Sequence, residues 1–138
     1  MKAHAEIHVP IRGPDDIVLA RKQGRELAEQ ARFTGSDLVR IATAISELAR
    51  NIVLYAGQGE IVLQLVHNNH TSGITVIAKD EGPGIQDIQK ATTVGYSTSG
   101  GLGAGLPGVR RLMDEFEIKS QVGKGTTVTA RKWNPRSS

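Results

Sequence analysis

The sequence predicts an α/β two-layer sandwich, in which a mixed, mostly antiparallel sheet carries helices on one face. Two helical patterns follow each other directly, at residues 17–31 and 38–53. Strand patterns then come in two pairs, at 61–66 with 74–78 and at 116–122 with 126–133. Strands paired in this way across short turns form antiparallel hairpins. Since helices do not alternate with strands, the order does not suit a doubly wound parallel sheet.

Proline, glycine and capping residues mark where the first elements begin and end. The alternation at 6–9 predicts a strand that stops at Pro10. The two acids after Pro14 favour the start of the first helix. Residues 34–37 (TGSD) are expected to break the chain and cap the second helix, which ends near Gly57.

The segment 81–108 differs in composition from the rest of the chain. It holds eight glycines and two prolines and shows little apolar periodicity, which is typical of a functional loop in a compact domain. A hairpin precedes it, with a predicted turn at 67–73 and a returning strand that leads to Asp80. A short helix is expected after it, around 109–113.

Composition predicts one domain spanning residues 1–138. The chain is 38% hydrophobic and 22% charged, as is usual for a globular protein. It has no cysteine, which excludes disulfides and thiolate metal sites. The formal charge of +3 is too weak to argue for nucleic-acid binding. Neither a signal peptide nor a membrane-spanning run is recognised, so the cytoplasm is the expected compartment.

Two polar side chains stand out on the second helix. Glu47 and Asn51 are one turn apart and therefore share a face, away from the apolar stripe of the helix. An amide oxygen suits a hard cation such as magnesium, and a carboxylate one turn earlier can accept a proton. Taken alone, such a pair is more often a solvated polar face.

The residues after the third predicted strand suit a purine. Asp80 stands at the strand end and is followed by EGPGI, residues 81–85. Its carboxylate could accept the exocyclic amine of adenine, with Gly82, Gly84 and Ile85 beside the ring. An ordinary Asp-Gly turn is the alternative.

Residues 97–106 (STSGGLGAGL) combine hydroxyls and glycines ahead of a helix start, where free N–H groups can bind phosphate. The candidates are Thr98, Ser99, Gly101, Gly103, Ala104, Gly105 and Leu106. Residues 103–108 match G-x-G-x-x-G, but no apolar strand precedes them and no P-loop is present, so a lid over phosphates fits better. The last hairpin turn, GKGTT at 123–127, reads as a tight β-turn, from which Thr126 could add a hydroxyl near the adenine edge.

In this order and spacing the four segments resemble the GHKL ATP-binding superfamily, shared by gyrase B, MutL, histidine kinases and anti-sigma-factor kinases. ELARN (47–51) is similar to its N box, and DEGPG (80–84), GLGAGL (101–106) and GKGT (123–126) are similar to its glycine boxes. The resemblance covers about residues 17–133 and implies the Bergerat fold with ATP and Mg²⁺ as cofactors.

TAISELARNI, YAGQGEI, STSGGLGAGLPGV and RRLMDEF resemble a narrower group, the RsbT-type switch serine/threonine kinases of the stressosome. That resemblance implies that Asn51 holds Mg²⁺, Glu47 is the catalytic base and Asp80 reads adenine. It also implies STAS-domain substrates of the RsbS and RsbR type and a PP2C-type phosphatase of the RsbU type as the partner that the freed kinase activates. A homodimer stays open.

One departure and two rival functions remain. Related kinases carry a basic residue just before the second glycine box, where this chain has Ser99 and two glycines. Phosphate charge must then be balanced by magnesium, by backbone amides, or by an arginine such as Arg50 or Arg110. A non-catalytic anti-sigma-factor-like binding module and a stand-alone ATPase share the same site, although an intact Glu47 argues against lost catalysis.

Overall fold

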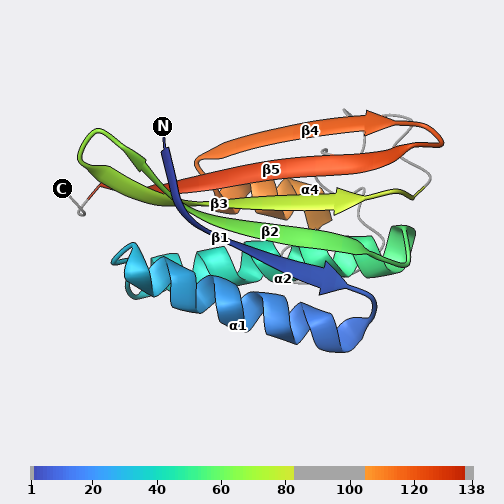
Figure 1. Ribbon diagram of the computed structural model, residues 1–138, viewed down its shortest axis with the longest axis horizontal. Coiled ribbons are helices and arrows are strands. Elements are labelled where there is room, and N and C mark those ends of the chain that lie inside the picture. The colour runs from blue at the N-terminus through green and yellow to red at the C-terminus, as the bar shows by residue number, and fades with distance from the viewer. Residues whose placement is uncertain (1, 83–104, 136–138) are drawn as a thin grey trace.

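The computed structural model describes residues 2–82 and 105–135 (Figure 1). Along these ranges the elements are β1 (Lys2–Ile11), α1 (Pro14–Gln30), α2 (Ser36–Tyr55), β2 (Gly59–Asn68), β3 (Thr71–Asp80), α4 (Gly105–Leu112), β4 (Glu115–Gln121) and β5 (Gly125–Asn134). No helix within them has the length and apolar character that crossing a membrane requires.

The strands form one sheet in the order β1-β2-β3-β5-β4, and each neighbouring pair is antiparallel. Figure 1 shows α1 and α2 side by side along one face, and α4 also packs on α2. The predicted two-layer α/β sandwich is therefore confirmed. Its sheet is antiparallel throughout the described residues instead of mixed. The chain turns back three times between β1 and β2, into α1, into α2 and into β2, so that β2 runs against β1.

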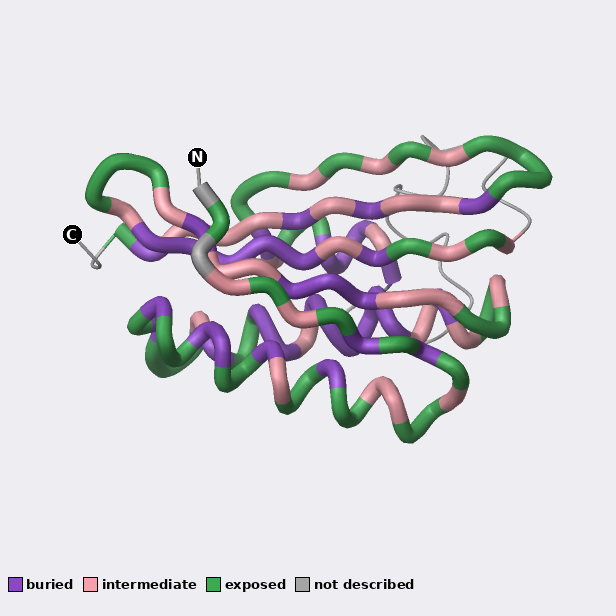
Figure 2. Tube along the Cα trace, viewed as in Figure 1, coloured by how far each residue is buried: buried purple, intermediate pink, exposed green. Residues whose placement is uncertain are grey.

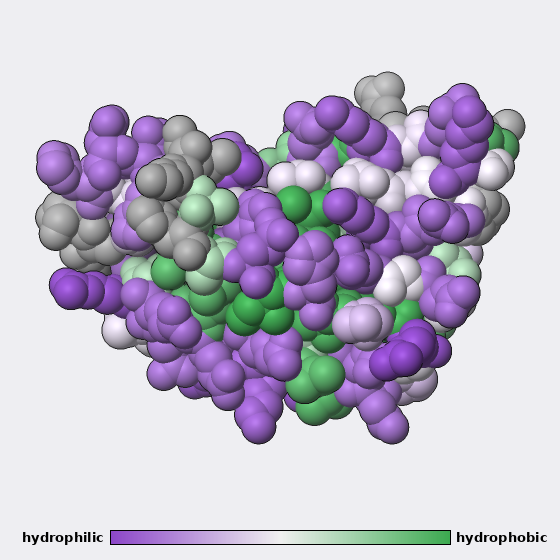
Figure 3. All heavy atoms as spheres, in the orientation of Figure 1, coloured by the Kyte–Doolittle hydropathy of each residue, from purple (hydrophilic) through white to green (hydrophobic). Residues whose placement is uncertain are grey.

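The core lies between the helices and the sheet face that they cover. Ile61 and Leu63 of β2 are buried there together with Ile45 and Leu48 of α2. Helix α1 comes so close at Gly24 that an added Cβ would lie 2.1 Å from Ile45 Cδ1. Figure 2 shows how burial follows these elements, and Figure 3 shows hydrophilic side chains around an apolar band along the middle of the same view.

The other face of the sheet carries a row of polar side chains, one from each strand. In register these are Glu6, Gln64, Thr75, Arg131 and Glu115. Gln64 Nε2 donates to Glu6 Oε1 at 2.6 Å. Arg131 donates to Thr75 Oγ1 at 2.8 Å and to Glu115 Oε1 at 2.6 Å. This polar row links strands sideways by side chains in addition to the backbone ladder.

Two strand boundaries differ from the prediction. β1 continues through Pro10, because β1 is an edge strand and the hydrogen bond that proline cannot donate has no second neighbour to serve. The first hairpin turn is confined to residues 69–70, since β2 reaches Asn68 and β3 starts at Thr71. Asn69 takes the left-handed φ of +58° that suits so short a turn.

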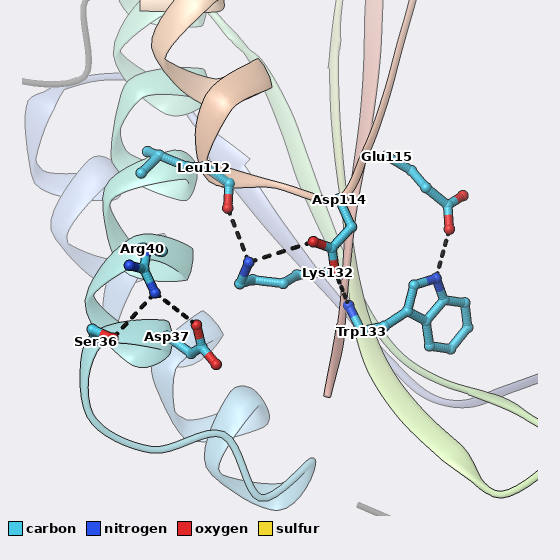
Figure 4. A network of polar contacts seen from close by, with 8 residues as sticks. All are labelled: Ser36, Asp37, Arg40, Leu112, Asp114, Glu115, Lys132 and Trp133. Atoms are coloured by element: carbon cyan, nitrogen blue, oxygen red, sulfur yellow. Dashed lines mark hydrogen bonds and ion pairs between the residues drawn. The ribbon is translucent and has the colours of Figure 1, made fainter. Parts of the chain in front are cut away.

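The predicted side-chain cap of α2 is wrong. Its N-cap is Gly35, at a φ of +55°, and no side chain bonds to the free N–H groups there. Ser36 and Asp37 already lie in the first turn, where Arg40 Nη1 donates to Ser36 Oγ at 3.1 Å and to Asp37 Oδ1 at 3.0 Å (Figure 4). The charge of Asp37 still favours the positive end of the helix dipole.

The helix predicted around 109–113 begins earlier, at Gly105, so the end of the glycine-rich segment is helical. At its other end, Lys132 Nζ of β5 donates to Leu112 O at 3.2 Å and pairs with Asp114 Oδ1 at 3.6 Å (Figure 4). A lysine at this place satisfies a carbonyl that the helix leaves unpaired. It thereby fixes the end of α4 against the sheet.

Candidate functional site

The site is built around the carboxyl end of β3. Asp80 is its last residue, and its Cα pairs in register with Gly59 of β2 on one side and with Thr126 of β5 on the other. Alternation along β3 places its side chain on the same face as the buried Ala78, which is the face that the helices cover. Asp80 Oδ1 accepts the backbone N–H of Gly82 at 2.9 Å, so the chain curls around this carboxylate as the strand ends.

Two glycines let the neighbouring strands approach the backbone of β3 closely at its end. Gly125 has a φ of +114°, and a Cβ there would lie 2.1 Å from the carbonyl oxygen of Asp80. A Cβ on Gly59 would lie 2.3 Å from the carbonyl oxygen of Lys79. Both obstacles are backbone atoms of the sheet, which cannot move aside as a flexible side chain can. The backbone around Asp80 therefore depends on glycine at both positions.

The end of α2 packs against the same place. A Cβ on Gly82 would lie 2.6 Å from Ala56 Cβ, and one on Gly59 would lie 2.9 Å from Ile52 Cγ2. Ile52 lies in the last turns of α2, and Ala56 is its C-cap. The half-buried Asn51 precedes Ile52 directly. Helix packing thus brings the amide-bearing part of α2 to the end of β3.

One turn before Asn51, Glu47 is almost completely enclosed, with 3% of its surface exposed. Its Oε1 accepts a hydrogen bond from Arg50 Nη1 at 2.8 Å. Its Oε2 is buried and has no hydrogen-bond partner among the residues that the structure describes. Leaving a buried acceptor unsatisfied costs on the order of 1–3 kcal/mol. An atom of this kind in a native fold therefore calls for an explanation, and a functional role is a common one.

The burial of Glu47 argues against the alternative of a solvated polar face. Every position from 44 to 49 of α2 is buried, including Ser46, whose Oγ donates to Ala42 O at 2.9 Å. The physical reason is that α4 contacts α2 in addition to α1 and the sheet, so most of the circumference of α2 is covered.

Three further predicted residues flank this arrangement. Thr126 lies beside Asp80 on β5, and its hydroxyl shares a 2.9 Å hydrogen bond with Ser120 Oγ across the β4–β5 hairpin. Gly105 starts α4 at a φ of +67° and is buried. Leu106 packs against the core. The hydroxyl of Thr126 thus already has a structural task within the hairpin.

The remaining predicted residues lie outside the described ranges: Gly84, Ile85, Thr98, Ser99, Gly101, Gly103 and Ala104. Within the described ranges, Asn51, Asp80, Gly82 and Thr126 gather where α2 and β3 end. Glu47 lies one helical turn, or about 6 Å, further back along α2.

Some supports of this site could not be found from the sequence. Gly59 and Gly125 matter because β2 and β5 flank β3, and no local signal encodes which strands become neighbours. The pairing of Glu47 with Arg50 did carry a signal, since opposite charges three residues apart on a helix can meet. Arg110, the other arginine considered for phosphate, is exposed in the last turn of α4.

Chemically, the three candidate side chains carry different groups. The amide oxygen of Asn51 suits a hard cation. The carboxylate of Asp80, held by Gly82, is a fixed acceptor for a planar amine. The buried Oε2 of Glu47, without a partner in the described part of the chain, is a carboxylate oxygen of the kind that can accept a proton.

The model of the histidine kinase-like ATPase domain matches residues 13–132 of this chain. The match covers far more than half of the sequence and includes Glu47, Asn51, Asp80, Gly82 and Thr126. The chain therefore belongs to the histidine kinase-like ATPase domain family, whose members form the GHKL type of ATP-binding fold.

Curated relatives narrow the class. The chain is 57% identical over 118 residues to the serine/threonine-protein kinase RsbT of Bacillus subtilis, which covers 86% of this chain and 89% of that protein. This confirms the predicted resemblance to RsbT-type kinases and, with it, the enzyme class of serine/threonine protein kinase. An anti-sigma F factor of Caldanaerobacter subterraneus is 31% identical over 122 residues, covering 86% of this chain and 85% of that protein.

Among solved structures, the chain resembles the RsbU and RsbW domains of a Mycobacterium tuberculosis protein, with a TM-score of 0.60 and 24% identity. The match covers 94% of this chain but 32% of that one, so this chain spans about a third of its length. At such an identity the likeness shows the fold alone.

Proposed function

We propose that this protein transfers the γ-phosphoryl group of ATP to a serine or threonine of a STAS-domain partner protein and, once released from it, activates a PP2C-type phosphatase. The observation that carries the catalytic part is the buried Oε2 of Glu47, which has no hydrogen-bond partner among the described residues. A structural ion pair would have no need to leave this atom unsatisfied, whereas a base must keep one lone pair for the incoming proton.

The residues present fit the cofactors that the family implies. Asn51 would hold Mg²⁺ through its amide oxygen, in keeping with a cation that takes few protein ligands and several phosphate and water oxygens. Asp80 would accept the amine of adenine, and the close glycine contacts at Gly59 and Gly125 hold its backbone in place for this task. When bound, magnesium would supply charge neutralisation at the phosphates.

Glu47 would act as the proton acceptor of the transfer. Its Oε2 would take the proton of the partner's hydroxyl while that oxygen bonds to the γ-phosphorus. The bond from the γ-phosphorus to the bridging oxygen breaks, and ADP leaves with the electron pair. Since phosphoryl transfer depends mainly on alignment and charge stabilisation, the protein's part is to fix these groups before the partner arrives.

The choice of partners rests on the relatives. RsbT is named a serine/threonine-protein kinase, and anti-sigma F factors are also similar to this chain over most of its length. These relatives support a partner-switching function. Its partners would be STAS proteins of the RsbS and RsbR type and a phosphatase of the RsbU type. A stressosome setting, a cytoplasmic location and a homodimer stay predictions.

The test is transfer of label from γ-³²P-ATP, with magnesium, to a purified STAS-domain protein from the same organism. We expect label on one serine or threonine of the partner and none without the kinase. Free phosphate without labelled partner would show a stand-alone ATPase instead. Nucleotide binding with neither product would show a binding module of the anti-sigma-factor type. Adding the phosphatase then tests activation, which should rise only after the STAS protein is phosphorylated.

A further inference from the structure

We infer that Arg50 is a positioning residue for Glu47: it holds one carboxylate oxygen so that the other, Oε2, stays aimed and bare for the proton of the substrate. This inference deepens the proposed function and rests on it. The sequence suggested Arg50 as one of the groups that could balance the charge of the phosphates. The inference gives this arginine a different role.

The first step is geometric. Arg50 follows Glu47 by three residues on α2, and its Nη1 lies 2.8 Å from Glu47 Oε1. The carboxylate is enclosed, with 4% of its side chain exposed, whereas the arginine side chain is 38% exposed. The guanidinium of the partly exposed Arg50 side chain therefore bonds to a carboxylate that is buried.

The second step concerns rotation. The terminal torsion of a glutamate is broad and roughly two-fold, so an unheld carboxylate exchanges its oxygens freely. One charge-assisted hydrogen bond removes this freedom, because turning the group away would break it. Arg50 thereby makes the two oxygens of Glu47 different: Oε1 is bonded, and Oε2 is left without a partner among the described residues. A carboxylate bound only for stability would gain from a donor on each oxygen.

The third step is a comparison within the same helix. Arg40 and Asp37 form the equivalent pair three residues apart, with Arg40 Nη1 3.0 Å from Asp37 Oδ1. There the acid is 37% exposed, so water can satisfy its lone pairs. Such surface pairs contribute little. The two pairs share their spacing and chemistry, and they differ in burial and in the bare oxygen.

The experiment uses Arg50→Met, which keeps the stem and removes the charge, and Arg50→Lys, which keeps the charge without the planar fork. Arg40→Met is the matched control. Steady-state phosphotransfer to the STAS partner gives kcat and the KM for ATP, calorimetry gives ATP affinity, and circular dichroism checks folding. We expect kcat to fall about 10–100-fold in Arg50→Met, with KM and ATP affinity within about threefold. Arg50→Lys should lie between Arg50→Met and the wild type, and Arg40→Met should match the wild type.

A double-mutant cycle shows whether Arg50 acts through Glu47. In a Glu47→Gln background, Arg50→Met should change kcat no further, because the group that it positions is gone. An unchanged kcat in Arg50→Met, an equal loss in both backgrounds, or a raised KM with kcat intact would overturn the inference. The raised KM would instead place Arg50 at the phosphates.

Failure of the positioning role and failure of the proposed base can be told apart. If Arg50→Met does not fold, Arg50→Lys carries the test, and a kcat equal to the wild type would then contradict the inference. If Glu47→Gln itself transfers phosphate at the wild-type rate, the proposed base fails. If Glu47→Gln is inactive while the Arg50 variants are normal, the positioning role alone fails.

Discussion

The carboxylates on the open face of the sheet and the carboxylate of Glu47 in the helical layer differ in how many of their oxygens are hydrogen-bonded. On the open face, Glu6 receives Gln64 on one oxygen and His8 on the other, at 2.6 and 2.7 Å. Glu115 likewise accepts hydrogen bonds from Arg131 Nη1 at 2.6 Å and from Trp133 Nε1 at 2.5 Å, the second of which is drawn in Figure 4. On the helical side, the far more buried Glu47 has a partner on one oxygen alone among the described residues.

This contrast runs against simple energetics. The pKa of Glu115 is held below its ordinary value, first by the hydrogen bond from the Trp133 indole and then by Arg131, and that of Glu6 is lowered by its bonds to Gln64 and His8. These side chains are close to water, which would satisfy them at little cost. The enclosed carboxylate is the one for which a missing bond costs most. Glu47 Oε2 thus has no hydrogen-bond partner among the described residues in spite of the cost in stability, and the proposed proton transfer would need such an atom.

Glu47→Gln gives the largest expected effect. The amide keeps the size of the side chain and removes the proton acceptor, so phosphotransfer should fall by about 10²–10⁴-fold, the usual contribution of a general base. ATP affinity should stay within about threefold of the wild type. Single-turnover transfer of label and calorimetric titration measure the two quantities.

The matched control is Glu115→Gln on the open face. Its phosphotransfer should equal that of the wild type, while the free energy of unfolding should fall by about 1 kcal/mol, a value kept low because this side chain is half exposed. If Glu47→Gln lost only stability, or Glu115→Gln lost activity, the contrast between the faces would be mistaken.

Asp80→Asn should have the next largest effect, and it should act on binding. The variant can still accept the N–H of Gly82 on its amide oxygen, so the backbone should keep its course. Its NH₂ group would meet the adenine amine as donor against donor. Losing one charged hydrogen bond of about 1.5–3 kcal/mol predicts ATP binding about 10–150-fold weaker. A normal calorimetric affinity would remove Asp80 from the adenine site.

His8→Gln should have the smallest effect, a pH-dependent one on stability. Hydrogen bonds to Glu6, first, and to Glu60 raise the pKa of His8 above its ordinary 6.5. A raised pKa in the folded state means that the stabilisation is fully present below the unfolded value and is lost as the pH rises through the folded value. The difference in unfolding free energy between wild type and variant should therefore shrink as the pH rises from the ordinary value of 6.5 through the raised pKa of the folded state.

Denaturant titrations at several pH values measure this difference. A background of Glu6→Gln and Glu60→Gln provides the control, because it removes the carboxylates that face His8 and leaves the charge of Lys79 nearby. The pH dependence of the His8 effect should disappear in that background. A constant difference across the range in the wild-type background would show that the histidine contributes through packing alone.

Much of the fold could be predicted because its signals are local. The acids after Pro14, the helical spacing of α2 and the glycine at the β4–β5 turn each depend on residues a few positions apart. The predicted strand boundaries were wrong where contacts between distant segments, and not local sequence, decide the structure. Pro10 is tolerated because β1 became an edge strand, and the turn at 69–70 is short because strand pairing continues to Asn68.

The sequence by itself determined the class of fold, the order of the motifs and the candidate side chains, since spacing along a helix or strand sets which residues share a face. Tertiary structure alone decided that Gly59 and Gly125 enclose the end of β3 and that Glu47 is buried. It also decided that, among residues 2–82 and 105–135, one oxygen of Glu47 has no hydrogen-bond partner. These features depend on which elements pack together, and such neighbours are chosen by the global burial of apolar surface, which no local pattern records.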